Sequence, residues 1–390
     1  MKSSYRTLAT AALIGVCCAG HITAGKNRGY TETDLVVNKI VNNVPTLIDA
    51  NGVVHIAKFF DPNLVNPWGV SESSTSPFWV SDNGAGLSTL YDTSGTPQSL
   101  IVSIPAPGEP LGNGGAPTGT VFNVASSAGA FMISGVTSGG LPTTQPAIFL
   151  FATEDGTIVG WNSGVNPPGF DPAKAGTYGI IATQTPGAIY KGLAIATDSG
   201  GTTRLYATDF HGGKVDVFDT SFQKVNSTGA FEDASLPQGY APFNIVPVTV
   251  NGSARLFVTY AVQDEDAEDD VSGQGHGIVN TFDFTGQSWR RFAQHGQLNS
   301  PWGIALAPAG FGDLGGTLWI GNFGNGHIDA YDPASGRFVS KVRNSQGQAL
   351  VIDGLWTIMF GNGGGDANTL YFAAGPNDEQ DGLFGSVGPN

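Results

Sequence analysis

The sequence predicts an all-β fold, a six-bladed β-propeller whose last blade is closed by an N-terminal strand. Three observations carry this prediction. One pattern of short strands and turns occurs six times along the chain. Glycine and proline account for 57 and 23 of the 390 residues, which is too many for long helices. The last repeat lacks its fourth strand.

The repeat is clearest in two distant segments, 66–95 and 300–336. Both contain Pro-Trp-Gly, an apolar run with a tryptophan, an Asn-Gly loop, Tyr-Asp and a glycine turn. Four further copies are weaker but keep this order. The six units begin near residues 66, 116, 190, 240, 300 and 353.

Each unit contains the material for about four short strands. The second strand is almost continuously apolar, as in Leu205–Asp209, so we expect both of its faces to be buried. The third strand ends in an aromatic residue followed by an acid or amide and then a turn residue. A fourth, weaker strand follows, as in Gln98–Ile104. Short strands at regular spacing are typical of sandwiches, barrels and propellers, and six such units favour the propeller.

The sixth unit ends after its third strand, near Val387. A propeller that stopped there would leave an unpaired sheet edge. We therefore expect the strand-like segment Thr33–Val41 to supply the missing outer strand of the last blade. The segment Val53–Phe60 is the alternative.

Residues 1–24 have the pattern of a secretory signal, followed by a single propeller domain over residues 25–390. Lys2 and Arg6 precede an apolar stretch at 8–20 that is too short to span a bilayer, and Ala24 is the expected last residue before cleavage. The chain is therefore expected to be secreted, to the periplasm or the extracellular space.

Both cysteines, Cys17 and Cys18, lie in this signal segment. The mature chain would then have no disulfide and no thiolate metal site; a lipidated cysteine is the alternative. The formal net charge of −15 disfavours nucleic acid as a partner. Beyond the N-terminus no apolar run reaches the length of a membrane span, and we expect a monomer.

Motifs across the mature chain resemble an uncharacterised family of secreted bacterial β-propellers, and the third unit also resembles the NHL and SMP-30-like propellers. The resemblance implies export and the propeller fold, but no reaction. The motifs are DPNLVNPWG (61–69), FATEDGTIVGW (151–161), YKGLA (190–194), LYATDFHGGKVDVFD (205–219), GYAPFNI (239–245), LNSPWGIALAPAGFG (298–312), IGNFGNGHIDAYDP (320–333) and VIDGLW (351–356).

In a propeller, the loops before the first strand and between the second and third strands gather on one face. This places a ring of carboxylates and amides around the channel mouth, a donor set that suits Ca²⁺. The metal candidates are Glu154, Asp209, Asn322, Asp264, Asp266 and Glu268. The alternatives are ordinary turn chemistry for Asp209 and a solvated acidic loop for 264–270, where Asp269 stands at a position that a calcium loop gives to glycine.

The ligand-binding candidates are Asn66, Trp68, Trp302 and Trp356. The indoles would stack on a sugar or another flat ligand; the alternative is that they pack between blades. The catalytic candidates are Lys191, His211 and Asp353. In a further alternative, a lyase that acts on a sugar or a polymer, Lys191 and His211 would be the catalytic residues.

The sequence contains no nucleophile elbow, zinc-protease motif or phosphate-binding loop. This favours a binding or scaffold propeller that engages a protein, glycan or small molecule through its loop face. The alternative is a metal-dependent hydrolase of the lactonase type, in which a cation at the channel mouth polarises a carbonyl group. Its ligands would come from Asn66, Glu154, Asp209, Asn322 and Asp353.

Overall fold

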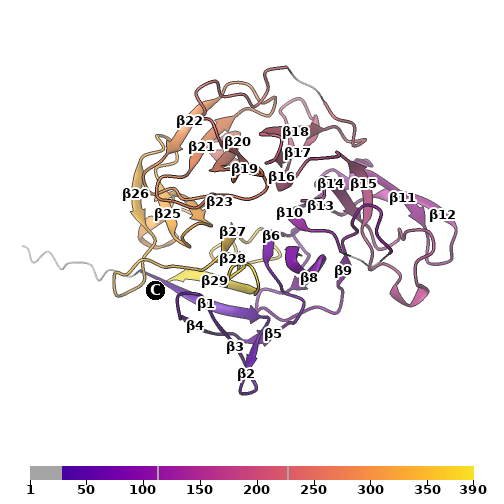
Figure 1. Ribbon diagram of the computed structural model, residues 1–390, viewed down its shortest axis with the longest axis horizontal. Coiled ribbons are helices and arrows are strands. Elements are labelled where there is room, and N and C mark those ends of the chain that lie inside the picture. Colours follow the sequence, from indigo (N-terminus) through magenta and orange to yellow (C-terminus); the bar gives the residue numbers. More distant parts are fainter. Residues whose placement is uncertain (1–28, 112–113, 226–227) are drawn as a thin grey trace, which may run out of the picture.

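The computed structural model describes residues 29–111, 114–225 and 228–390. The expected signal segment, residues 1–24, lies outside this range. The described chain is almost entirely β-structure, and its strands form six main sheets that follow one another around a ring (Figure 1). This architecture confirms the predicted β-propeller.

The first three sheets come from the first half of the chain. The first contains β6 (Pro67–Ser71), β7 (Phe78–Asp82), β8 (Leu87–Tyr91) and β9 (Val102–Ser103). The second contains β10 (Pro117–Phe122), β13 (Phe149–Thr153), β14 (Thr157–Trp161) and β15 (Ile180–Gln184). The third contains β16 (Tyr190–Thr197), β17 (Thr203–Asp209) and β18 (Lys214–Phe218).

The other three sheets complete the ring. The fourth contains β19 (Tyr240–Val250), β20 (Ser253–Val262), β21 (Ile278–Phe282) and β22 (Arg290–Gln294). The fifth contains β23 (Pro301–Leu306), β24 (Leu318–Asn322), β25 (Ile328–Tyr331) and β26 (Phe338–Lys341). The sixth contains β27 (Leu355–Phe360), β28 (Leu370–Ala374), β29 (Leu383–Pro389), β1 (Tyr30–Val37) and β5 (Phe59–Phe60).

The smaller elements do not belong to the six main sheets. They are the sheet of β2 (Ile40–Val41), β3 (Val44–Ile48) and β4 (Val54–Ile56), the hairpin of β11 (Met132–Val136) and β12 (Pro142–Pro146), and the 3₁₀ turns η1 (Asn83–Ala85), η2 (Ser126–Ala128), η3 (Pro172–Lys174) and η4 (Gly312–Leu314). No helix in the described part of the chain has the length and apolar character needed to cross a membrane.

The ring is closed by the N-terminus, as predicted. Strand β1 pairs antiparallel with β29, from Tyr30 opposite Pro389 to Val37 opposite Leu383. The closing strand begins three residues before the predicted segment and ends at Val37, because Ile40 and Val41 turn away into β2. The alternative segment contributes only β5, which pairs with the outer side of β1.

The Pro-Trp-Gly repeat is explained by how closely the inner strands of neighbouring blades approach. A Cβ atom on Gly69 would lie 2.4 Å from the carbonyl oxygen of Thr118, and one on Gly303 would lie 2.7 Å from that of Trp356. Side-chain hydrogen bonds also join the inner strands of neighbouring blades; for example, Asn244 donates to the carbonyl oxygen of Trp302 at 2.8 Å. Glycine at this position lets the inner strands meet around the channel.

The acid that ends each third strand builds the next turn. Asp92 Oδ1 accepts hydrogen bonds from the backbone amides of Ser94 at 2.8 Å and Thr96 at 3.0 Å. Asp219 and Asp283 do the same in their own blades. The second strands β7, β13, β24 and β28 are buried along their whole length, as their apolar composition predicts.

Candidate functional site

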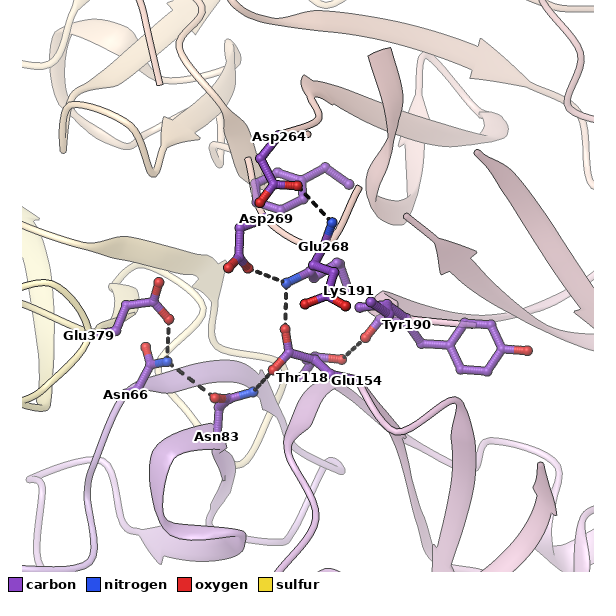
Figure 2. Close-up of polar contacts among 12 residues, drawn as sticks. Asn66, Asn83, Thr118, Glu154, Tyr190, Lys191, Asp264, Glu268, Asp269 and Glu379 are labelled. Carbon is purple, nitrogen blue, oxygen red and sulfur yellow. Dashed lines mark hydrogen bonds and ion pairs between the residues drawn. The ribbon is translucent and has the colours of Figure 1, made fainter. Parts of the chain in front are cut away.

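Polar side chains from five blades converge at one end of the central channel (Figure 2). They come from the residue before β6, from η1, from the loop after β13, from β16, and from the β20–β21 and β28–β29 loops. We call them the channel-mouth cluster: Asn66, Asn83, Glu154, Lys191, Asp269 and Glu379.

Lys191 is the centre of this cluster. Its side chain is only 1% exposed, and its ammonium pairs with Glu154 Oε1 and, at 3.0 Å, with Asp269 Oδ1. The nitrogen also lies 5.2 Å from the centre of the Trp68 ring, within cation–π range. Burial alone would lower the pKa of Lys191, but the two carboxylates raise it above its ordinary value. The two ion pairs therefore favour the charged ammonium form of Lys191.

Two amides link this ion pair to a further carboxylate. Asn83 donates to Glu154 Oε2 at 2.8 Å, and Asn66 donates to Glu379 Oε2 at 2.5 Å and to Asn83 Oδ1 at 3.3 Å (Figure 2). Asn66 Oδ1 in turn accepts a hydrogen bond from the indole of Trp356 at 3.0 Å. The amides are thus held with defined orientations by their surroundings.

The backbone at the mouth is strained. Asn66 has φ of 47° although it precedes a proline, and Asn377, Asp378 and Glu379 have φ of 61°, 51° and 63° in succession. Asp353 supports this left-handed turn, because its Oδ2 accepts a hydrogen bond from the Asn377 amide at 3.0 Å. Such conformations cost free energy for non-glycine residues and concentrate at functional sites.

Two carboxyl groups at the mouth have perturbed acidities. Burial raises the pKa of Glu379 to about 7, although the Asn66 amide and the Lys191 charge oppose the shift. Burial likewise raises the pKa of Asp270 to about 6, and its Oδ2 has no hydrogen-bond partner among the described residues. Glu154 and Asp269 already pair with the single ammonium, so Glu379 and Asp270, when they ionise, add negative charge that Lys191 does not neutralise.

Three tryptophans form the floor beneath Lys191. Trp68 and Trp356 stack with ring centres 3.6 Å apart, and Trp302 meets both edge-on. Their exposures are 2%, 1% and 4%, respectively. The Trp302 indole donates to the carbonyl oxygen of Lys191 at 3.1 Å, which fixes the strand that carries the ammonium. The indole faces contact one another and the lysine.

Beyond this floor, the inner strands line a cavity of about 370 Å³ with largely apolar walls. Its residues follow the tryptophans and their counterparts along the inner strands, for example Val70, Leu193 and Ile304. Trp302 lines this cavity and also donates a hydrogen bond to the backbone of Lys191.

Several other candidates have local partners instead. Asp209 pairs with Lys214 at 2.9 Å and caps its own turn at Gly212. Asn322 is buried and donates to Asp329 at 2.9 Å. His211 is exposed on the loop after β17, and within the described range no hydrogen bond or ion pair joins it to Lys191.

The acidic loop contributes an ion-pair partner of Lys191 to the channel-mouth cluster. Asp264 Oδ1 accepts a hydrogen bond from the Glu268 amide at 2.9 Å, and Asp266 is exposed. This turn directs Asp269 onto Lys191, which lies 78 positions earlier in the sequence. Asp269 and Asp270 are not among the site residues that the sequence predicts; the signal for them is that the acidic loop stands at the position of a mouth loop.

The fold and the mouth define the protein as a β-propeller with a polar site at one end of its channel. A solved Bacteroides thetaiotaomicron protein of unknown function shares this fold, with a TM-score of 0.51 and 10% identity, covering 92% of this chain and 76% of the other. No family model matches the chain.

The relatives identified by sequence are viral. The chain is 30% identical over 388 residues to uncharacterized protein R648 of Acanthamoeba polyphaga mimivirus, covering 98% of this chain and 87% of the relative. It is 32% identical over 340 residues to uncharacterized protein L690 of the same virus, covering 85% of this chain and 82% of that protein. The chain belongs to the family that contains these two proteins.

Proposed function

We propose that this protein is a binding propeller whose channel mouth takes up a small cationic ligand. The observation that carries the proposal is the charge imbalance at Lys191. Glu154, Asp269, Asp270 and Glu379 surround a single ammonium. A ligand amine placed among them would supply the positive charge that the site lacks, and would stabilise the ionised forms of Glu379 and Asp270.

The surroundings of the charge also suit such a ligand. The oxygens of Asn66, Asn83 and Glu154 are acceptors close to the ammonium, and the strained turn that carries Glu379 places its carboxylate beside Asn66. A small number of polar groups held in fixed orientations is typical of small-molecule recognition. This function agrees with the binding class that the sequence favours.

A metal-dependent hydrolase of the lactonase type is the second candidate. It is favoured by the same oxygen donors, which suit Ca²⁺, and by Glu379, whose pKa of about 7 suits a general acid or base. Against it, the Lys191 ammonium already lies between Glu154 and Asp269 and supplies the positive charge there. A calcium ion would have to displace it, so we favour binding over hydrolysis.

Isothermal titration calorimetry of the purified protein with a short linear diamine tests the proposal. We expect saturable binding that strengthens as the pH rises through about 7, where Glu379 ionises. Glu379→Gln should weaken binding about tenfold, the effect of losing roughly 1.4 kcal/mol. The matched control is Glu232→Gln, which removes one exposed carboxylate outside the mouth and should bind as the wild type does.

The outcomes separate the two candidates. No heat with the diamine, or equal binding by both variants, would contradict the amine proposal. Binding of Ca²⁺ that is lost in Glu154→Gln, together with turnover of a lactone, would support the hydrolase instead.

We also propose that residues 1–24 direct export of the chain. The support is the sequence pattern alone, with its basic start, apolar stretch and Ala24. Expression of the full chain in a bacterial host, followed by N-terminal sequencing of the exported material, should give a first residue of Gly25. An intact N-terminus and retention in the cytoplasm would overturn this assignment.

A further inference from the structure

A second cluster of ionisable side chains, with no member in the channel-mouth cluster, lies where the closing strand β1 meets the small β2–β3–β4 sheet (Figure 1). It consists of two residues of β1, one of β4 and one that follows β3. We call Glu32, Asp34, Asp49 and His55 the edge cluster.

The strands bring these side chains together by their alternation. Glu32 and Asp34 are two residues apart on β1, so they share one face, and a β-bulge follows Asp34. His55 is the buried middle residue of β4, whose neighbours Val54 and Ile56 are exposed. Strand β4 therefore buries its polar residue and exposes its apolar ones, whereas a strand usually buries its apolar residues.

The donor atoms lie within reach of one ion. His55 Nδ1 is 3.3 Å from Asp34 Oδ1 and 3.6 Å from Glu32 Oε1. One ligand atom from each of these three residues lies within 4.8 Å of the others. An imidazole nitrogen and two carboxylate oxygens on one side of a site are a common donor set for a divalent transition ion.

Asp49 is placed to orient the imidazole. Its Oδ1 accepts hydrogen bonds from the amides of Asn51 at 2.9 Å and Val53 at 2.7 Å in the β3–β4 turn. This leaves Oδ2 directed at His55 Nε2, 3.7 Å away. A carboxylate behind the far nitrogen is the usual second partner of a metal-bound histidine.

The cluster lacks the hydrogen bonds that its burial demands. The side chains of His55 and Asp49 are 4% and 0% exposed. Among the described residues, Glu32 Oε1, Asp49 Oδ2 and His55 Nε2 are buried without a hydrogen-bond partner. Buried polar atoms without partners are rare and indicate a missing water, proton or ion.

The charges point to a cation. Within the described chain, the ion pairs of Glu32, Asp34 and Asp49 are all with His55. Three carboxyl groups thus face one imidazole in a site that is mostly shielded from water. A bound dication would offset the repulsion between them.

We propose that the edge cluster is a structural metal site for a divalent transition ion of the zinc type. Glu32, Asp34 and His55 Nδ1 ligate the ion, and Asp49 positions His55 through Nε2. The ion would join β1, the strand that closes the ring, to the β3–β4 hairpin. Metal binding would then add directly to the stability of ring closure.

The test uses the full-length protein, stripped with EDTA and titrated with ZnCl₂. We expect one equivalent of Zn²⁺ to bind and the melting temperature to rise by several degrees, with the rise reversed by EDTA. His55→Gln should abolish both effects, whereas His295→Gln, which changes an exposed histidine of another blade, should abolish neither. Asp49→Asn should keep the stoichiometry but weaken affinity about tenfold or more.

A second variant and a second metal ion test the proposal even if His55→Gln fails to fold. Asp34→Asn is the second ligand variant, and Co²⁺ in place of Zn²⁺ should give a visible absorption band that this variant loses. Folded wild-type protein that binds neither ion would overturn the site. Zinc binding that survives both Asp34→Asn and His55→Gln would overturn the ligand assignment.

Discussion

At the scale of single residues, Lys191 stabilises the channel-mouth cluster through its ion pairs with Glu154 and Asp269. Lys191→Met would remove the ammonium and leave Glu154 and Asp269 facing each other. Breaking a fully buried pair costs about 3–5 kcal/mol. Because both carboxylates retain contact with solvent, we expect a loss of about 2 kcal/mol in the free energy of unfolding, measured by urea denaturation. The double variant Lys191→Met/Glu154→Gln should be less destabilised than the single one; equal losses would contradict the ion-pair account.

The raised pKa values of Glu379 and Asp270 predict that the free energy of unfolding decreases as the pH rises. Burial raises the pKa of Glu379 from its ordinary 4.5 to about 7, so the folded state holds a proton that the unfolded state has released across this interval. Stability should therefore fall as the pH rises from about 4.5 to about 7. Asp270 acts in the same direction from 3.8 to about 6.

The measurement is the unfolding free energy at a series of pH values. In Glu379→Gln the decline between pH 5 and 7 should be shallower than in the wild type, because the glutamine does not titrate. An unchanged slope would show that Glu379 has an ordinary acidity in the folded state.

At the scale of elements, the inner-strand glycines set the distance between blades. In Gly303→Ala the new methyl group would meet the Trp356 carbonyl at 2.7 Å and the Ile358 amide at 2.8 Å. We expect a loss of about 1–3 kcal/mol from this overpacking, measured by thermal or urea unfolding. Gly388→Ala is the control, because a methyl group there has open space. Equal stability of the two variants would contradict the close-approach argument.

Strand β1 is the element on which closure depends. It buries Tyr30, Leu35, Val36 and Val37 and covers the edge of β29. Each buried side chain contributes roughly 1.5–3 kcal/mol, so deletion of residues 30–37 should remove cooperative folding or lower the melting temperature sharply. Size-exclusion chromatography should also show aggregation through the exposed β29 edge. A monomer with wild-type melting would contradict the closure.

At the scale of the whole molecule, the repeat made the fold predictable. Turn residues such as Asp92 and Asp219 act on neighbours within four positions, so their role can be recognised without the structure. The closing strand followed from the missing fourth strand of the last unit.

The two sites depend on contacts that no local pattern contains. Asp269 reaches Lys191 across 78 positions, and His55 faces Asp34 across 21. The segment Val53–Phe60 is predicted only as an alternative closing strand, and its histidine, His55, is the one sequence signal of a buried polar group there. The loop positions predict that Asn66, Asn83, Glu154, Lys191 and Glu379 lie around the mouth, but they do not predict that Asp269 pairs with Lys191.

The central claim is that the mouth binds a cation among its carboxylates, and the most direct test is a crystal structure of the protein with the diamine bound. The account predicts a ligand nitrogen within hydrogen-bonding distance of Glu379 and of Asp269 or Asp270, with Lys191 still paired to Glu154. A diamine bound elsewhere, or a mouth where Lys191 has moved away to admit a metal ion on Glu154, would contradict it.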